Sequence, residues 1–194
     1  APVLNDRVDA IPRLAHSQIA AERPLSLKYD DRRLLAFYFD LTAMPPADQI
    51  RAISAAQEFI RKQVTPADLV AILKYAGDEV VVHEDFTADR ARLLSTLETM
   101  VVGEDTSVPD PVNDGSFGQS GGEFAIFRTD RQLSALQTAA KMLGQLNEKK
   151  SLIYFASGLR LNGTDNQAQL RATVNAANRA GVSIFSIDAR GLVA

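Results

Sequence analysis

The sequence contains no cysteine and only two histidines in 194 residues. The missing thiols exclude disulfides, thiolate catalysis and cysteine-ligated zinc. With His16 and His83 as the whole supply of imidazole, neither a Ser-His-Asp triad nor a histidine-ligated zinc site is expected. Apolar runs are only a few residues long, so no membrane span is predicted.

The chain also has no excess of positive charge: it contains 21 Lys and Arg and 24 Asp and Glu, which gives a net charge of -3. A chain without a basic field is not expected to bind nucleic acid. The 46% of hydrophobic and 23% of charged residues are ordinary for a globular protein, and the length suits one domain with helices on both faces of a sheet. Residues 1–30 are weakly patterned and are interpreted as an N-terminal arm.

The clearest pattern begins after the arm. Residues 34–39 form an uninterrupted apolar run that ends in Asp40, which predicts a strand buried on both faces of a parallel sheet. A helix is expected from Pro46 to about residue 63. The segments 68–75 and 79–86 predict two strands, and the two-residue turn Gly77-Asp78 makes them antiparallel neighbours, because a parallel pair needs a long crossover.

The remaining segments predict helix 88–100, a helix around residues 133–146, strand 151–156, helix 167–180 and strand 182–188. Between helix 88–100 and the helix around residues 133–146, residues 103–122 are rich in Gly, Pro, Asp and Ser and are interpreted as a flexible insertion. The order predicts a Rossmann-like three-layer α/β/α domain over residues 31–194, with a mainly parallel central sheet and one antiparallel edge strand. Such sheets bind ligands at the carboxyl ends of their strands, here beside Asp40.

With this element order, the sequence Asp40-Leu41-Thr42-Ala43-Met44 resembles a von Willebrand factor type A (VWA) domain and is most similar to the VWFA-related subgroup of acidobacterial proteins. The similar segments are residues 34–44, 66–73, 85–94, 129–143, 150–158 and 187–192. The resemblance implies a bacterial, exported protein, periplasmic or extracellular, whose fold is truncated at its C-terminal end. It also implies a protein-binding or adhesion-type module with an unidentified protein partner and no catalytic residues.

Members of this family often hold a divalent cation at a metal-ion-dependent adhesion site. The site combines Asp-x-Ser-x-Ser after the first strand, a Thr on a later loop and an Asp after the fourth strand. By this resemblance Asp40, Thr42 and Thr129 are the candidate ligands of Mg²⁺, or of Mn²⁺ or Ca²⁺.

The metal site implied by the resemblance is degenerate. Met44 replaces the second Ser, and a thioether is a poor ligand for a hard cation. Ser157 stands where the fourth-strand carboxylate is expected, and Asp130 is an alternative oxygen donor beside Thr129. Met44, Asp130 and Ser157 are therefore interpreted as bordering a ligand-binding surface with a weak cation site. Asp188 is expected two strands away, roughly 10 Å sideways, which is too far to share one ion.

Each candidate also has a structural interpretation. Asp40 can end a strand and accept backbone N–H groups of the next turn. Thr129 and Asp130 can cap the helix that follows them. Ser157 can be a turn residue or a hydrolase nucleophile, although Phe155 replaces the first glycine of a nucleophile elbow. A Rossmann-like hydrolase and a purely structural domain of a larger exported protein therefore stay open as alternatives.

Overall fold

The computed structural model describes residues 19, 29, 32–42, 44–100, 102–103, 120–159 and 166–191. Five strands form one sheet in the order β3-β2-β1-β4-β5. All neighbouring strands are parallel except β2 and β3, which are antiparallel. The strands are β1 (Arg33–Asp40), β2 (Asp68–Ala76), β3 (Glu79–Thr87), β4 (Lys150–Ala156) and β5 (Val182–Asp188). The predicted sheet, with its single antiparallel edge strand, is confirmed.

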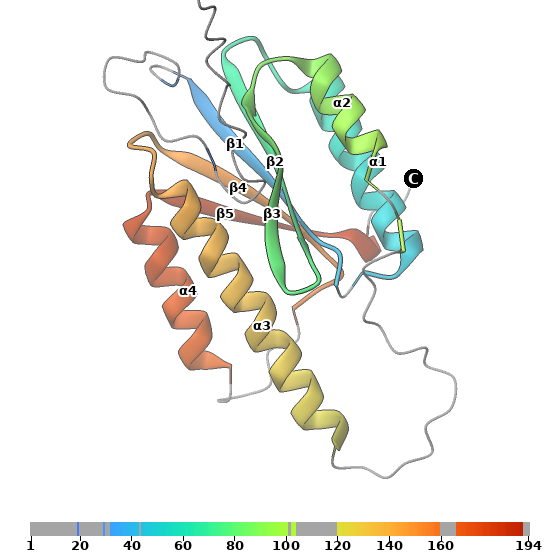
Figure 1. Cartoon of the computed structure of the whole chain (residues 1–194), viewed down its shortest axis with the longest axis vertical. Coiled ribbons are helices and arrows are strands. Elements are labelled where there is room, and N and C mark those ends of the chain that lie inside the picture. Colours follow the sequence, from blue (N-terminus) through green and yellow to red (C-terminus); the bar gives the residue numbers. More distant parts are fainter. Residues whose placement is uncertain are drawn as a thin grey trace, which may run out of the picture.

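Helices cover both faces of this sheet. They are α1 (Pro46–Lys62), α2 (Arg90–Glu98), α3 (Ser120–Leu143) and α4 (Gln167–Arg179), and the 3₁₀ helix η1 (Ala189–Gly191) follows β5. Figure 1 shows α1 and α2 on one side of the sheet and α3 and α4 on the other, which makes the three layers that the element order predicts. Among the described residues no helix is both long enough and apolar enough to cross a membrane.

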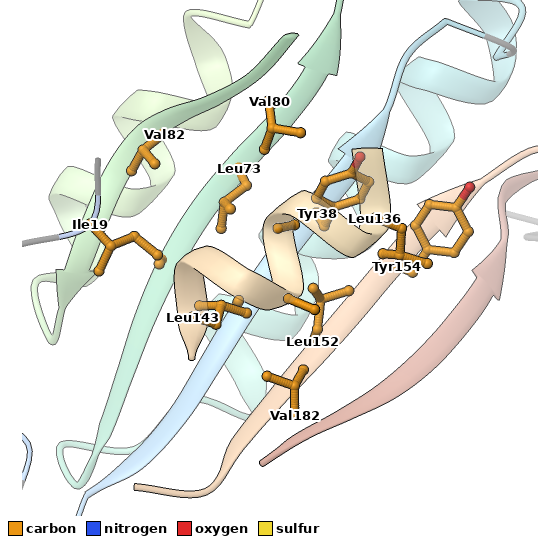
Figure 2. Packing of buried hydrophobic residues seen from close by; sticks show 14 of the residues in the cluster. Ile19, Tyr38, Leu73, Val80, Val82, Leu136, Leu143, Leu152, Tyr154 and Val182 are labelled. Carbon is orange, nitrogen blue, oxygen red and sulfur yellow. The ribbon is translucent and has the colours of Figure 1, made fainter. Parts of the chain in front are cut away.

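The central strand β1 is buried on both faces because its side chains alternate between two cores. Leu34, Ala36 and Tyr38 belong to the core beneath α3 and α4, which Figure 2 shows at close range. Phe37 and Phe39 belong to the core beneath α1 and α2. This alternation directs the last residue of β1 toward α3.

The turn between β2 and β3 has the geometry that the sequence predicts. Gly77 and Asp78 have φ values of 54° and 71°, the pair of left-handed conformations that a two-residue hairpin turn requires. The turn lies at the carboxyl end of β2 and beside the end of β1. It therefore brings the carboxylate of Asp78 to the edge of the sheet where a ligand is expected.

Helix α3 begins earlier than the sequence pattern indicates. It starts at Ser120, so Thr129 and Asp130 lie in the middle of the helix, and their interpretation as its N-terminal cap is wrong. After Gly122 no glycine or proline interrupts the segment, so nothing in the sequence prevents the helix from extending back past Thr129. Of the predicted insertion, residues 120–122 belong to α3, and residues 104–119 lie outside the described residues.

Two residues of the predicted N-terminal arm are part of the core. Ile19 and Tyr29 are both buried in the cluster beneath α3. The Tyr29 ring packs edge-on against Phe86 of β3, with 6.0 Å between ring centroids. Ile19 belongs to the same buried cluster as Val82 of β3, and Figure 2 labels both. Ile19 and Tyr29 therefore belong to the core on the α3 side of the sheet.

At the opposite end of the sheet, the Arg33–Asp68 pair ties the starts of β1 and β2 together. The Arg33 guanidinium donates to both carboxylate oxygens of Asp68, at 2.7 and 2.8 Å, and Thr65 donates to the same carboxylate from its backbone and its hydroxyl. The hydrogen bonds from Arg33 are the main reason that the pKa of Asp68 falls to about 2 from its ordinary 3.8.

The Asp68 pair predicts an acid-dependent loss of stability. Because the folded-state pKa is the lower one, the stabilisation is complete above the ordinary pKa of 3.8 and is lost as the pH falls toward about 2. We expect it to reach about 1–2 kcal/mol at neutral pH, since the exposed Arg33 is screened by solvent. Denaturant unfolding of wild type and Asp68→Asn checks this. The difference between the two proteins should shrink from neutral pH to pH 2, and a constant difference would count against the assignment.

Candidate functional site at the carboxyl edge of the sheet

Asp40 ends β1 and is 1% exposed to solvent. One carboxylate oxygen accepts the Thr42 hydroxyl at 2.7 Å and the Thr42 backbone N–H at 3.3 Å. The other oxygen accepts the Gln132 side-chain amide of α3 at 2.7 Å and the Tyr154 hydroxyl of β4 at 2.9 Å. Burial raises the pKa of Asp40, although these hydrogen bonds act in the opposite direction. The carboxylate therefore joins three separate segments at the strand ends.

Strand register surrounds Asp40 with tyrosines. Tyr75 of β2 is the register partner of Asp40, and Tyr154 of β4 is the partner of Tyr38. The Tyr38 and Tyr154 rings, both labelled in Figure 2, lie 5.6 Å apart between centroids. Burial raises the pKa of both phenols well above the ordinary value, so both stay protonated at neutral pH. The Tyr154 proton is donated to Asp40, whereas the Tyr38 hydroxyl is buried without a hydrogen-bond partner among the described residues.

The groups around Asp40 do not fit a divalent cation. Mg²⁺ takes hard oxygen ligands at about 2.0–2.1 Å, and usually one or two carboxylates hold it. Here N–H and O–H donors occupy both oxygens of Asp40. Within the described part of the chain, no group of three or more His, Asp or Glu side chains is placed to hold a metal ion. The cation therefore stays a prediction that this geometry does not favour.

The other predicted metal ligands are brought close to Asp40 only in part. Thr42 is bonded to Asp40 directly. Thr129 is buried, and it lies on α3 one helical turn before Gln132. Asp130 accepts a hydrogen bond at 2.8 Å from the Asn166 side chain, in the segment that leads into α4. Asp130 therefore joins α3 to α4 and does not contact Asp40.

Met44 and Ser157 have structural partners of their own. Met44 is completely buried, and its carbonyl accepts the Gln49 side-chain amide at 2.9 Å, which fixes the loop between β1 and α1. The Ser157 hydroxyl donates to Asp48 of α1 at 2.6 Å, and Asp48 also pairs with Arg51. Ser157 therefore joins the end of β4 to the first turn of α1.

Ser157 lacks the partners of a hydrolase nucleophile among the described residues. Its hydrogen-bond acceptor is a carboxylate that is already paired with a guanidinium. The described histidine, His83, lies on β3, which is separated from β4 by β2 and β1. Three strand spacings amount to about 14 Å, which is beyond hydrogen-bond reach.

Gly158 follows Ser157 with a φ of +85°, and a Cβ at this position would lie 2.4 Å from Nη2 of Arg190. Because the backbone is left-handed, Gly158→Ala is expected to lower the free energy of unfolding by about 1–2 kcal/mol. Gly191→Ala is the matched control, since Gly191 has ordinary φ and open space around it. Chemical denaturation of the two variants checks this. Equal effects of the two substitutions would contradict the assigned strain.

A concave region opens beside the Asp40 network. Its volume is about 210 Å³, and it lies between the loop after β1, the β2–β3 turn and α3. The lining residues are Thr42, Tyr75, Asp78, Phe127, Arg128, Arg131 and Gln132. Thr42 and Gln132 also donate to Asp40, so the buried network forms part of the wall of this cavity. We call it the edge cavity.

Sequence reasoning missed most of the residues that form the edge cavity and the network. Gln132 carried one usable signal, because it is a polar residue one turn before Leu136 on the apolar side of the helix. It is 4% exposed, as a buried polar partner should be. Tyr154, Arg128 and Arg131 carried no such signal, because their roles depend on contacts between distant segments.

Comparison with models of protein families gives no match, and no curated protein matches the sequence. Solved structures are similar in fold. One is an aerotolerance-related membrane protein from Bacteroides fragilis NCTC 9343 with multiple mutations to serines, 13% identical over 80% of this chain and 92% of that chain, with a TM-score of 0.38. Another is the SpRpn10 VWA domain, 11% identical over 80% of this chain and 88% of that chain, with a TM-score of 0.40. A third is the TFIIH p34 N-terminal domain, 16% identical over 81% of each chain, with a TM-score of 0.43.

At these identities and TM-scores, the similarities imply no shared ligand or activity. The fold is VWA-like by its own topology: a central β1, a mainly parallel sheet, an antiparallel edge strand β3 and helices on both faces. Membership of the acidobacterial subgroup, a bacterial source and export stay predictions.

Proposed function

We propose that the domain is a protein-binding module that uses the carboxyl edge of its sheet, and that it is not an enzyme. The observation that carries this proposal is an exposed aromatic side chain in the second turn of α3. Phe127 is 59% exposed, and the guanidinium of Arg131 lies 5.2 Å from its ring centroid. An exposed ring backed by arginine, beside a cavity, is the composition that dominates binding energy in protein interfaces.

The position of this side chain follows from the packing of α3. Gln132 contacts Asp40 at the end of β1, and Phe127 precedes Gln132 by five residues, about 7.5 Å along the helix axis. In Figure 1 the first turns of α3 extend past the ends of the strands. Phe127 and Arg131 are one turn apart and therefore share a face of the helix. The helix therefore presents both groups together.

Asp40 is part of the proposal as a structural residue. Its carboxylate joins the β1 end, α3 and β4 through hydrogen bonds within the chain. We propose that this network holds the edge in shape without a cation. A partner then meets a preformed surface, which lowers the ordering cost of binding.

The experiment is capture of a partner from extracts of the source cells by the immobilised chain, comparing wild type with Phe127→Ser. Phe185→Ser is the matched control, because Phe185 is an exposed phenylalanine, 54% accessible, on the distant strand β5. We expect one partner to be captured by wild type and by Phe185→Ser and to be lost with Phe127→Ser at unchanged stability. Loss with Phe185→Ser alone would place the binding surface on β5 and overturn the proposal.

A further inference from the structure

We propose that the edge cavity binds a carboxylate side chain of the partner directly, through the guanidinium groups of Arg128 and Arg131. This inference rests on the proposed function and adds the chemistry of the contact. Two arginines lie on one side of a cavity of about 210 Å³, and a guanidinium recognises a carboxylate through paired, charge-assisted hydrogen bonds.

The charges around the edge cavity favour an anion. Arg131 pairs with Asp78 of the β2–β3 turn, whereas Arg128 forms no ion pair with a described residue. The described charged residues of the lining are these two arginines and one aspartate, so the cavity carries an excess of one positive charge. Asp40 does not line the cavity, and its carboxylate oxygens accept donors from Thr42 and Gln132. An incoming carboxylate therefore meets guanidinium groups rather than the buried acid.

The size of the edge cavity selects a single side chain. Small-molecule pockets usually exceed about 300 Å³, so 210 Å³ suits an anchoring residue better than a whole metabolite. A second cavity of about 420 Å³ adjoins the edge cavity at the Asp78–Arg131 pair, with Val80 and Met142 in its walls. The two cavities share Tyr75, Asp78 and Arg131. The partner segment that fits both is an acidic residue close to an apolar one.

The test uses N-acetyl-aspartate amide as the probe and N-acetyl-asparagine amide as its uncharged match. Both are titrated into the ¹⁵N-labelled chain at constant ionic strength while the backbone amide resonances are followed. We expect saturable shifts at Thr42 and over residues 127–132 with the aspartate probe and none with the asparagine probe. Equal shifts with both probes, or shifts elsewhere only, would overturn the inference.

Substitutions of arginine test whether Arg128 and Arg131 bind the aspartate probe. Arg128→Gln combined with Arg131→Gln should weaken binding of the aspartate probe at least tenfold. Arg171→Gln on α4 should leave it unchanged, because Arg171 is an exposed arginine outside the edge cavity and its neighbour. Full retention of binding in the double variant would contradict the proposal.

A second variant is expected to improve binding. Asp78→Asn removes the carboxylate that competes for Arg131, and asparagine tolerates the φ of 71° at this position. Binding of the aspartate probe should tighten several-fold in this variant, and unchanged or weaker binding would count against the inference.

Partner capture and probe binding together distinguish an error in the binding surface from an error in the carboxylate contact. If Phe127→Ser abolishes partner capture while the double arginine variant captures normally and the aspartate probe does not bind, the surface is correct and the carboxylate inference is wrong. If neither the Phe127 nor the arginine substitutions affect capture, the proposed surface itself is wrong.

Discussion

Replacing Asp40 by alanine is expected to lower the free energy of unfolding by about 3–5 kcal/mol, as much in EDTA as in Mg²⁺, because a buried hydrogen-bond network is broken. The substitution removes the acceptor of four buried donors: the Thr42 backbone N–H and hydroxyl, the Gln132 amide and the Tyr154 hydroxyl. Each buried donor left without an acceptor costs about 1–3 kcal/mol. Urea unfolding measures the effect as a lower midpoint at an unchanged slope.

Asp188→Ala is the control for this prediction. Asp188 also ends a parallel strand, but its side chain is 49% exposed and pairs with the exposed Arg190. Removing the Asp188 carboxylate should change the free energy of unfolding little, because water can solvate the exposed Arg190 in its place. Tyr154→Phe should give a partial loss of about 1–2 kcal/mol, since one of the hydrogen bonds to Asp40 is removed. If Asp40→Ala costs no more than Asp188→Ala, the network does not hold the edge together.

Tyr29→Ala is expected to lower the free energy of unfolding by about 3–5 kcal/mol, although Tyr29 lies in a weakly patterned part of the sequence. The side chain is 1% exposed and packs against Phe86 in the core beneath α3. Its loss leaves a cavity between the arm and β3 that the surrounding strands cannot fill completely. The same urea measurement applies.

Tyr29→Phe separates the ring from the hydroxyl in this experiment. It keeps the edge-on contact with Phe86, so most of the stability should return. An unchanged midpoint for Tyr29→Ala would show that residue 29 contributes nothing to the core, and residues 1–30 would then be a separate arm, as the sequence pattern predicts.

The sequence predicts the sheet well because its signals are local. The apolar run before Asp40 identifies β1 as a strand buried on both faces, and the structure places it at the centre. Gly77-Asp78 identifies the β2–β3 hairpin because only a few residue types adopt two successive positive φ values. Together with the helices that alternate with the other strands, these two segments predict a mainly parallel sheet with one antiparallel edge.

The site was predicted only in part because its contacts are distant in sequence. Asp40 was correctly placed at a central strand end, but its partners Gln132 and Tyr154 lie 92 and 114 residues away. No periodicity or spacing reports such a pairing. The pattern also placed Thr129 before a helix, since the apolar stripe becomes clear only from Leu133, whereas the helix begins at Ser120. Because α3 begins at Ser120, Phe127 is part of the helix and lines the edge cavity.

Thermal unfolding of the wild-type chain in EDTA, and then in millimolar Mg²⁺, Mn²⁺ or Ca²⁺, tests most directly whether the carboxyl edge is held by hydrogen bonds within the chain. A cation at 100 times its dissociation constant would stabilise the fold by about 2.7 kcal/mol. Because donors already occupy both oxygens of Asp40, we predict the same unfolding temperature in every solution. A rise in unfolding temperature that appears in wild type and disappears in Asp40→Ala would contradict this and would establish a working cation site.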